Sequence, residues 1–134
     1  MKRSPLIISI EGIPCAGKST LQESLCKEYG GRVIPHLWDF GGGLQKYITI
    51  PKTYPEIRER ESQILQMNIK MLDAADKARK AGKFAYLHQS YVSSLAFTYA
   101  LSGSTKIDTL RECAENYFTA LHNKTLKMPD MYIF

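Results

Sequence analysis

Four short segments of the chain are rich in apolar residues and have the length of β-strands. Leu6–Ile10 is a continuous apolar run, the form typical of a buried central strand in a parallel sheet. Three further strands are predicted at Arg32–Pro35, Phe84–Leu87 and Met131–Phe134. The pattern therefore predicts a sheet with the first strand in its interior.

Between these segments, apolar residues recur at helical spacing. Residues 21–29 carry Leu, Leu and Tyr four positions apart and predict a helix that the Gly-Gly pair at 30–31 terminates. Pro55 suits a first helical position and begins a long amphipathic helix that runs towards Gly82. One side of this helix is lined by Ile57, Ile64, Leu65, Asn68, Leu72, Ala75 and Ala78.

The remaining segments predict a glycine-rich loop and two more helices. Gly41–Gly43 predict a mobile loop, and Ser93 to Leu101 predict a helix that Gly103 stops. Thr105, with Asp108 three residues on, resembles the start of the last helix. The order β-α-β-α-β-α-α-β predicts an α/β fold in three layers, with helices on both faces of a parallel sheet of four visible strands.

Composition restricts the possible classes of protein and partner only slightly. The chain has 134 residues, enough for one domain with a single core, and its 44% hydrophobic and 23% charged residues are typical of a soluble globular protein. The net charge of +5 is modest and its lysines and arginines are scattered, so a nucleic-acid partner is not indicated. Lys2-Arg3 precede an apolar run too short for a signal peptide or a membrane span. Three cysteines without metal spacing indicate reduced thiols in a cytoplasmic protein.

The loop after the first strand carries the most specific motif. Gly12, four spacer residues and Gly17-Lys18-Ser19 match the phosphate-binding loop pattern G-x-x-x-x-G-K-[ST], after a strand and opening a helix. Backbone N–H groups of such a loop form a concave nest for a phosphate, and the helix N-terminus adds a partial positive charge. The motif predicts a bound nucleoside triphosphate with Mg²⁺.

Each residue of this motif has an expected role. Lys18 reaches the β- and γ-phosphates, Ser19 provides a hydroxyl ligand for Mg²⁺, and Thr20 caps the helix or packs against it. The residues expected to cradle the phosphates are Gly12, Pro14, Cys15, Ala16 and Gly17.

Three segments together resemble the thymidylate kinase and deoxynucleoside kinase superfamily. Residues 10–20 are similar to the E-G-x-x-x-A-G-K-[ST]-T opening of those enzymes. Ala-Gly-Lys at 81–83, a strand, and Ser-Tyr-Val-Ser-Ser-Leu-Ala-Phe at 90–97 are similar to a second run that they carry. Met-Pro-Asp-Met-Tyr-Ile-Phe at 128–134 resembles the beginning of the strand before their lid. The order and spacing of the segments hold across the whole chain.

The resemblance implies phosphoryl transfer from ATP, with Mg²⁺, to a nucleoside or nucleoside monophosphate. It also implies a P-loop fold with five parallel strands, a mobile lid and often a homodimer. The fifth strand and the lid would follow residue 134, so we expect residues 1–134 to be the amino-terminal portion of such a domain. The resemblance places Thr20 at the α-phosphate and Tyr91 at the acceptor sugar, although Tyr91 also suits the core.

The chain departs from the family's pattern on the acceptor side. His88-Gln89 stand where Asp-Arg or Glu-Arg is usual, and neutral His and Gln lack both the acid's charge and arginine's fork of donors. His88 also ends a predicted strand, where a partly buried histidine is common. Pro35-His36 stand where deoxynucleoside kinases place Pro-Glu, whose carboxylate is the base. Asn68 is nearest to the arginine that reads the base in thymidylate kinases, and residues 13–16 contain no arginine to replace that of the lid.

The loop after the second strand supplies further candidates. Asp39 lies at a carboxyl end, where ligands bind in open α/β sheets, and is either a base for an acceptor hydroxyl or a solvated loop residue. His36 is the competing base, or bonds the backbone. Trp38 and Phe40 either stack a nucleobase or pack the loop against its helix.

Phosphoryl transfer is the leading interpretation, with Lys18 and the loop holding the donor and residues 36–43 and 88–95 holding the acceptor. A non-catalytic nucleotide-binding protein of the same fold is the first alternative, favoured by His88-Gln89. The second alternative is a P-loop NTPase of another class, although the chain has no base-reading motif like N-K-x-D.

Overall fold

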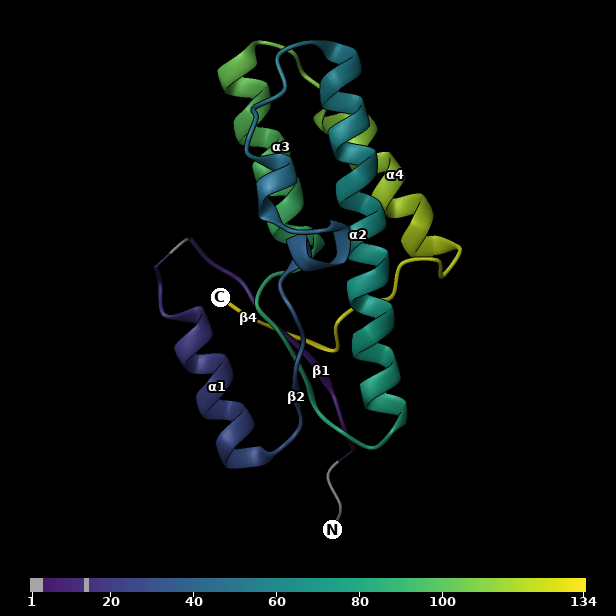
Figure 1. The fold of residues 1–134 in the computed structure, drawn as a ribbon. Coiled ribbons are helices and arrows are strands. Elements are labelled where there is room, and N and C mark those ends of the chain that lie inside the picture. Colours follow the sequence, from purple (N-terminus) through teal and green to yellow (C-terminus); the bar gives the residue numbers. More distant parts are fainter. Residues whose placement is uncertain (1–3, 14) are drawn as a thin grey trace.

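The chain forms an α/β fold around a four-stranded parallel sheet in the computed structural model, which describes residues 4–13 and 15–134 (Figure 1). The strands lie in the order β2-β3-β1-β4. Their bounds are β1 (Ile7–Ile10), β2 (Arg32–Val33), β3 (Ala85–Leu87) and β4 (Met131–Ile133). Each strand lies at a predicted segment, and the predicted interior position of the first strand is confirmed.

Strand β1 is the centre of the fold. Ile8 pairs with Tyr86 of β3 on one side and with Met131 of β4 on the other. All four residues of β1 are buried, because helices cover the sheet and neighbouring strands cover both edges of β1. This double burial explains why β1 reads as an apolar run rather than an alternation.

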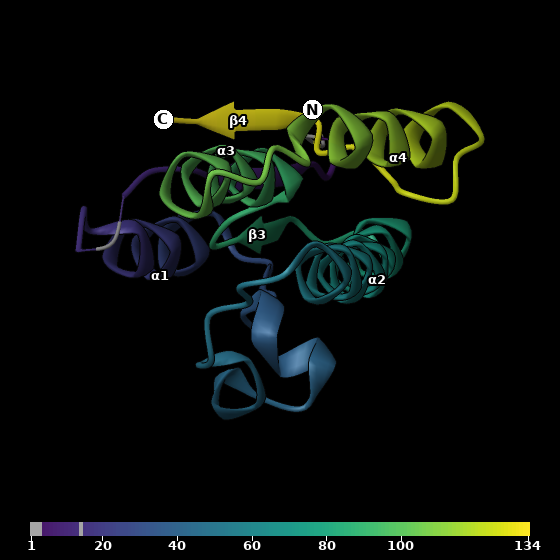
Figure 2. The same cartoon turned by 90° about the horizontal axis from the view of Figure 1, so that it is seen from above.

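Within residues 4–13 and 15–134, four helices and two short 3-10 helices connect the strands. Helices α1 and α2 lie on opposite sides of the sheet, which is compatible with a three-layer fold (Figures 1 and 2). Helices α3 and α4 lie beside the first half of α2, beyond the carboxyl ends of the strands (Figure 1). The bounds are α1 (Lys18–Tyr29), η1 (Leu37–Gly41), η2 (Leu44–Tyr47), α2 (Tyr54–Lys80), α3 (Tyr91–Thr105) and α4 (Leu110–His122). Within the described residues, no helix has both the length and the apolar character needed to span a bilayer.

Several helix boundaries differ from those predicted, most of all the end of α3 and the start of α4. Helix α3 continues through Gly103, since glycine inside a helix costs only about 1 kcal/mol relative to alanine. The helix ends at Thr105, where Lys106 adopts the left-handed conformation that closes the last turn. Helix α4 begins at Leu110, and the N–H of Leu110 donates a hydrogen bond to the Asp108 carboxylate. Of the predicted glycine-rich loop at 41–43, Gly41 ends η1, and Gly42 and Gly43 lie between η1 and η2.

The buried side of α1 is polar. Its apolar positions at 21 and 29 are exposed, whereas Gln22 is buried and its Nε2 donates to the backbone oxygen of Tyr86, 2.7 Å away. The turn that follows brings Gly31 against β3, and a Cβ at Gly31 would lie 2.5 Å from the oxygen of Phe84. Gly31 also has φ of +115°, so this turn requires glycine for two reasons.

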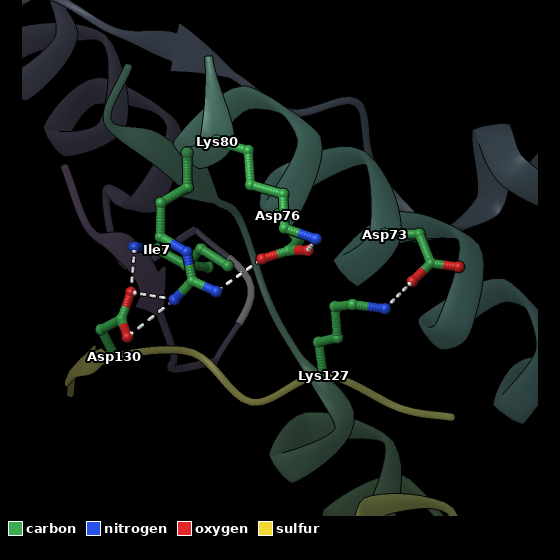
Figure 3. Close-up of polar contacts among 7 residues, drawn as sticks. Ile7, Asp73, Asp76, Lys80, Lys127 and Asp130 are labelled. Carbon is green, nitrogen blue, oxygen red and sulfur yellow. Dashed lines mark hydrogen bonds and ion pairs between the residues drawn. The ribbon is translucent and has the colours of Figure 1, made fainter. Parts of the chain in front are cut away.

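Ion pairs join the end of α2 to the segment before β4. Asp130 accepts a hydrogen bond from the backbone N–H of Ile7, 2.7 Å away, and also binds Arg79 at 3.0 Å (Figure 3). Arg79 in turn binds the buried Asp76, which Lys80 also contacts. Burial opposes ionisation of Asp76, but hydrogen bonds from Lys80 and Arg79 outweigh it and lower the pKa of this carboxyl. This network holds β4 against β1.

Candidate functional site

The loop between β1 and α1 exposes backbone at a helix N-terminus. Gly12 has φ of +144° and Gly17, which precedes α1, has φ of +87°, conformations that glycine adopts without strain. Cys15 and Ala16 are exposed, and the first turn of α1 contains no acidic residue. Pro14 lies outside the described residues. The loop thus combines accessible backbone with the positive end of a helix dipole, the combination that binds anions.

Lys18 is folded back onto this loop. Its ammonium Nζ donates to the backbone oxygens of Gly12, 2.8 Å away, and Ile13, 2.6 Å away. The residue is 5% exposed, whereas Ser19 and Thr20 are exposed beside it on the first turn of α1. The motif therefore places the Lys18 ammonium, the Ser19 hydroxyl and exposed loop backbone next to one another. No group of three or more His, Cys, Asp or Glu residues suited to a metal occurs among residues 4–13 and 15–134.

A cavity of about 490 Å³ opens next to the loop. Its residues come from the start of the loop, from η1, from α2, from the segment after β3 with α3, and from the end of the chain. They are Glu11, Gly12, Ile13, Leu37, Trp38, Ile64, Gln89, Ser90, Val92, Ser93, Ser94, Ala96, Phe97 and Phe134. The cavity has largely apolar walls with a few polar side chains, a composition typical of small-molecule sites.

Glu11 is the carboxylate of this cavity, and the sequence analysis assigned it no role. It is 5% exposed. Its Oε1 accepts hydrogen bonds from Ser9, 2.6 Å away, and Ser90, 2.5 Å away, and its Oε2 accepts one from Ser93. The three hydroxyls come from β1 and from the beginning of α3, so the carboxylate ties these elements together. A charged residue directly after a buried strand, at the carboxyl end of the sheet, was the available signal.

Two of the predicted acceptor-side residues reach the cavity. Trp38 lines it from η1, and its ring lies 5.1 Å from that of Tyr47. Gln89 lines it beside the loop, and its Nε2 donates to the Gly12 oxygen, 3.3 Å away. Phe40 packs against the hydrophobic core instead.

Asn68 and Tyr91 lie in the helical part of the molecule. Asn68 is fully buried, and its Nδ2 lies within hydrogen-bond distance of oxygens of Ile64, Ser94 and Tyr117. The hydroxyl of Tyr91 lies 2.8 Å from that of Tyr132. Both residues have partners within the protein and do not line the cavity, so the structure assigns them packing contacts.

His36, His88 and Asp39 lie at the carboxyl ends of β2 and β3. The two imidazole rings are 4.3 Å apart. Burial, followed by the charges of His36 and Lys18, lowers the pKa of His88. Asp39 is exposed and its Oδ2 accepts a hydrogen bond from the backbone N–H of His36, 3.1 Å away, which holds the first turn of η1. The two histidines are thus brought together near the loop, whereas Asp39 stabilises its own turn.

Comparison with models of protein families and with curated proteins finds no match for this chain. The likeness to nucleoside and nucleotide kinases therefore depends on the motifs at residues 10–20, 81–97 and 128–134.

Proposed function

We propose that this protein transfers a phosphoryl group from MgATP to a nucleoside or nucleoside monophosphate, on a P-loop kinase fold. One observation carries the proposal. The motif at residues 12–20 follows a buried parallel strand and includes the first turn of α1, directly beside a cavity of about 490 Å³. A phosphate donor and a small acceptor can therefore occupy neighbouring sites.

The groups in the loop suit a magnesium polyphosphate. Accessible backbone at residues 12, 13 and 15–17 and the N-terminus of α1 attract phosphate oxygens. The Lys18 ammonium is available once it exchanges a loop carbonyl for a phosphate. Ser19 offers an exposed hydroxyl to Mg²⁺, and Thr20 lies beside it. When bound, MgATP would supply the phosphoryl group.

The acceptor side requires orientation and a proton acceptor. Trp38 offers an aromatic face to a nucleobase, and Gln89 offers a polar contact next to the loop. His36 and Asp39 are the candidate bases. His88 favours its neutral form, since burial, followed by its neighbours His36 and Lys18, lowers its pKa. Phosphoryl transfer depends mainly on positioning and charge stabilisation, so these residues act chiefly by holding the acceptor oxygen in line.

A second candidate function is nucleotide binding without transfer. Its support is the absence of lysine and arginine from the described lining of the cavity, where related kinases use arginine to stabilise transferred charge. This candidate predicts that MgATP binds through the same loop while no acceptor is phosphorylated.

The test measures transfer from γ-labelled MgATP to a panel of nucleosides and nucleoside monophosphates. Lys18→Ala is compared with Lys27→Ala, a matched change of an exposed lysine in the last turn of α1. We expect Lys18→Ala to reduce transfer by about 100-fold or more, because one charge-stabilising donor commonly has that effect, and Lys27→Ala to leave transfer unchanged. Absence of transfer by the unaltered protein, with MgATP binding intact, would favour the second candidate. Absence of MgATP binding would refute both.

A further inference from the structure

Two histidines from neighbouring strands of the sheet meet beside the phosphate loop. His36 lies between β2 and η1, His88 follows β3, and their imidazole rings are 4.3 Å apart. The next residue, Gln89, donates its Nε2 to the Gly12 oxygen in the loop, 3.3 Å away. Positions 36 and 88 are separate departures from the kinase pattern in the sequence, and folding brings them into one pair next to the loop.

The charged groups that face this pair come from three elements. Lys18 on α1 disfavours a positive charge on His88. Glu11, at the end of β1, acts in the opposite direction, but serine hydroxyls already donate to both of its oxygens. The Asp39 carboxylate on η1 accepts a hydrogen bond from the backbone N–H of His36, 3.1 Å away. Burial, then His36 and Lys18, outweigh Glu11 and lower the pKa of His88 in the unliganded protein.

A polyphosphate in the loop would reverse this balance. Its negative charge would attract the Lys18 ammonium, which in the free protein donates to the carbonyl oxygens of Gly12 and Ile13. The ligand would thus compensate the charge that disfavours protonation of His88, and its remaining negative charge would favour an imidazolium. A protonated pair would also add positive charge beside a cavity whose described lining contains no lysine or arginine.

The pair has room for one proton. Two imidazolium ions whose rings are 4.3 Å apart repel each other, so protonation of one ring disfavours protonation of the other. The rings therefore titrate as a unit, and one of them remains neutral after the first proton has been taken up. A neutral ring stays available as a base for an acceptor hydroxyl.

We propose that the His36–His88 pair takes up one proton from solvent, on an imidazole nitrogen, when a polyphosphate binds to the phosphate loop. This inference rests on the proposed function and adds a regulation by pH to its donor site. Binding that takes up a proton is favoured by a higher proton concentration. MgATP should therefore bind more tightly as pH falls, by about threefold or more between about pH 8 and about pH 6.5.

The test is titration calorimetry with MgATP near the ordinary pKa of histidine, at about pH 6.5. The same titration is carried out in PIPES and in bis-Tris, because these buffers differ in ionisation enthalpy and the difference in heat gives the number of protons taken up. We expect uptake of about half a proton or more per MgATP bound for the unaltered protein, and less than about 0.2 for the double variant His36→Asn/His88→Asn.

The chain provides its own matched control. His122 is the third histidine, exposed in the last turn of α4, so His122→Asn should leave the proton uptake unchanged. A second measurement uses the unaltered protein and does not depend on folding of the double variant. In NMR titrations of the three imidazole Cε1–H signals, MgATP should move the midpoint of the pair to higher pH and leave that of His122 in place.

The outcomes separate this inference from the proposed function. MgATP binding without proton uptake, with uptake that survives in the double variant, or with an unmoved midpoint of the pair would overturn the inference and leave the kinase proposal standing. Proton-coupled binding of MgATP without transfer to any acceptor would overturn the kinase proposal and support the inference. Absence of MgATP binding would overturn both.

Discussion

Replacing Arg79 with alanine tests how β4 is held beside β1. The guanidinium connects Asp76, a buried carboxylate on α2, with Asp130, the residue directly before β4 (Figure 3). Asp130 in turn bonds the backbone N–H of Ile7 in β1. Because β4 has only three residues, we expect its pairing with β1 to depend on this anchor.

The size of the effect follows from the exposure of each pair. The side chains of Arg79 and Asp130 are each about one third exposed, 33% and 30%, so their ion pair is worth about 1 kcal/mol at most. The Asp76 side chain is 5% exposed, and without Arg79 its only remaining ion-pair partner in this network is Lys80. Loss of one partner by a buried charge costs about 1–3 kcal/mol. Arg79→Ala should therefore lower the free energy of unfolding by about 2–4 kcal/mol.

The assay is urea unfolding followed by the fluorescence of Trp38, the single tryptophan of the chain. Arg111→Ala is the control, because the Arg111–Glu115 pair is exposed and should contribute less than about 0.5 kcal/mol. A loss for Arg79→Ala no greater than that of the control would refute the reasoning.

The same variant has an expected pH dependence. The pKa of Asp76 is lowered in the folded protein, so its ionised form adds stability above the pKa of the unfolded chain, and this stability is lost as pH falls through the folded pKa. Without Arg79, fewer hydrogen bonds offset the effect of burial on the Asp76 carboxyl, so its pKa in the folded protein rises. The acid unfolding midpoint of Arg79→Ala should therefore lie at a higher pH than that of the unaltered protein.

Three other substitutions have defined outcomes. Gly31→Ala would place a Cβ 2.5 Å from the oxygen of Phe84 at φ of +115°, so the unfolding free energy should fall by about 2 kcal/mol or more, and an unchanged urea midpoint would contradict this. Tyr117→Phe removes one acceptor from the buried Nδ2 of Asn68 and should cost about 1 kcal/mol in the same assay. The pKa of His88 is lowered by burial first, so the unfolded chain binds more protons below about pH 6.5 and stability falls as pH decreases there. His88→Asn should flatten this part of a stability–pH curve, and an unchanged slope would show that His88 is not its source.

Local sequence patterns were sufficient for most of the fold. The run at residues 6–10 predicted the central strand because a strand covered on all sides must be apolar. The long helix was predicted from its spacing, and six of the seven residues assigned to one side of it are buried. Helix α3 was predicted too short, because glycine is typical of a helix end, whereas Gly103 lies inside this helix.

The composition of the candidate site depended on contacts between distant parts of the chain. Spacing predicted Lys18 and its loop, because strand, turn and helix are consecutive. It did not predict that serines near position 90 would surround Glu11, 79 or more residues earlier in the chain. It also did not predict that Asn68 would be enclosed by α3 and α4. Local hydrogen bonding and apolar periodicity are properties of neighbouring residues, so the sequence alone determined the strands, the helices and the phosphate-loop motif. The cavity, its acidic charge and the Arg79 anchor are produced by packing of segments far apart in the chain, so only the tertiary structure decided them.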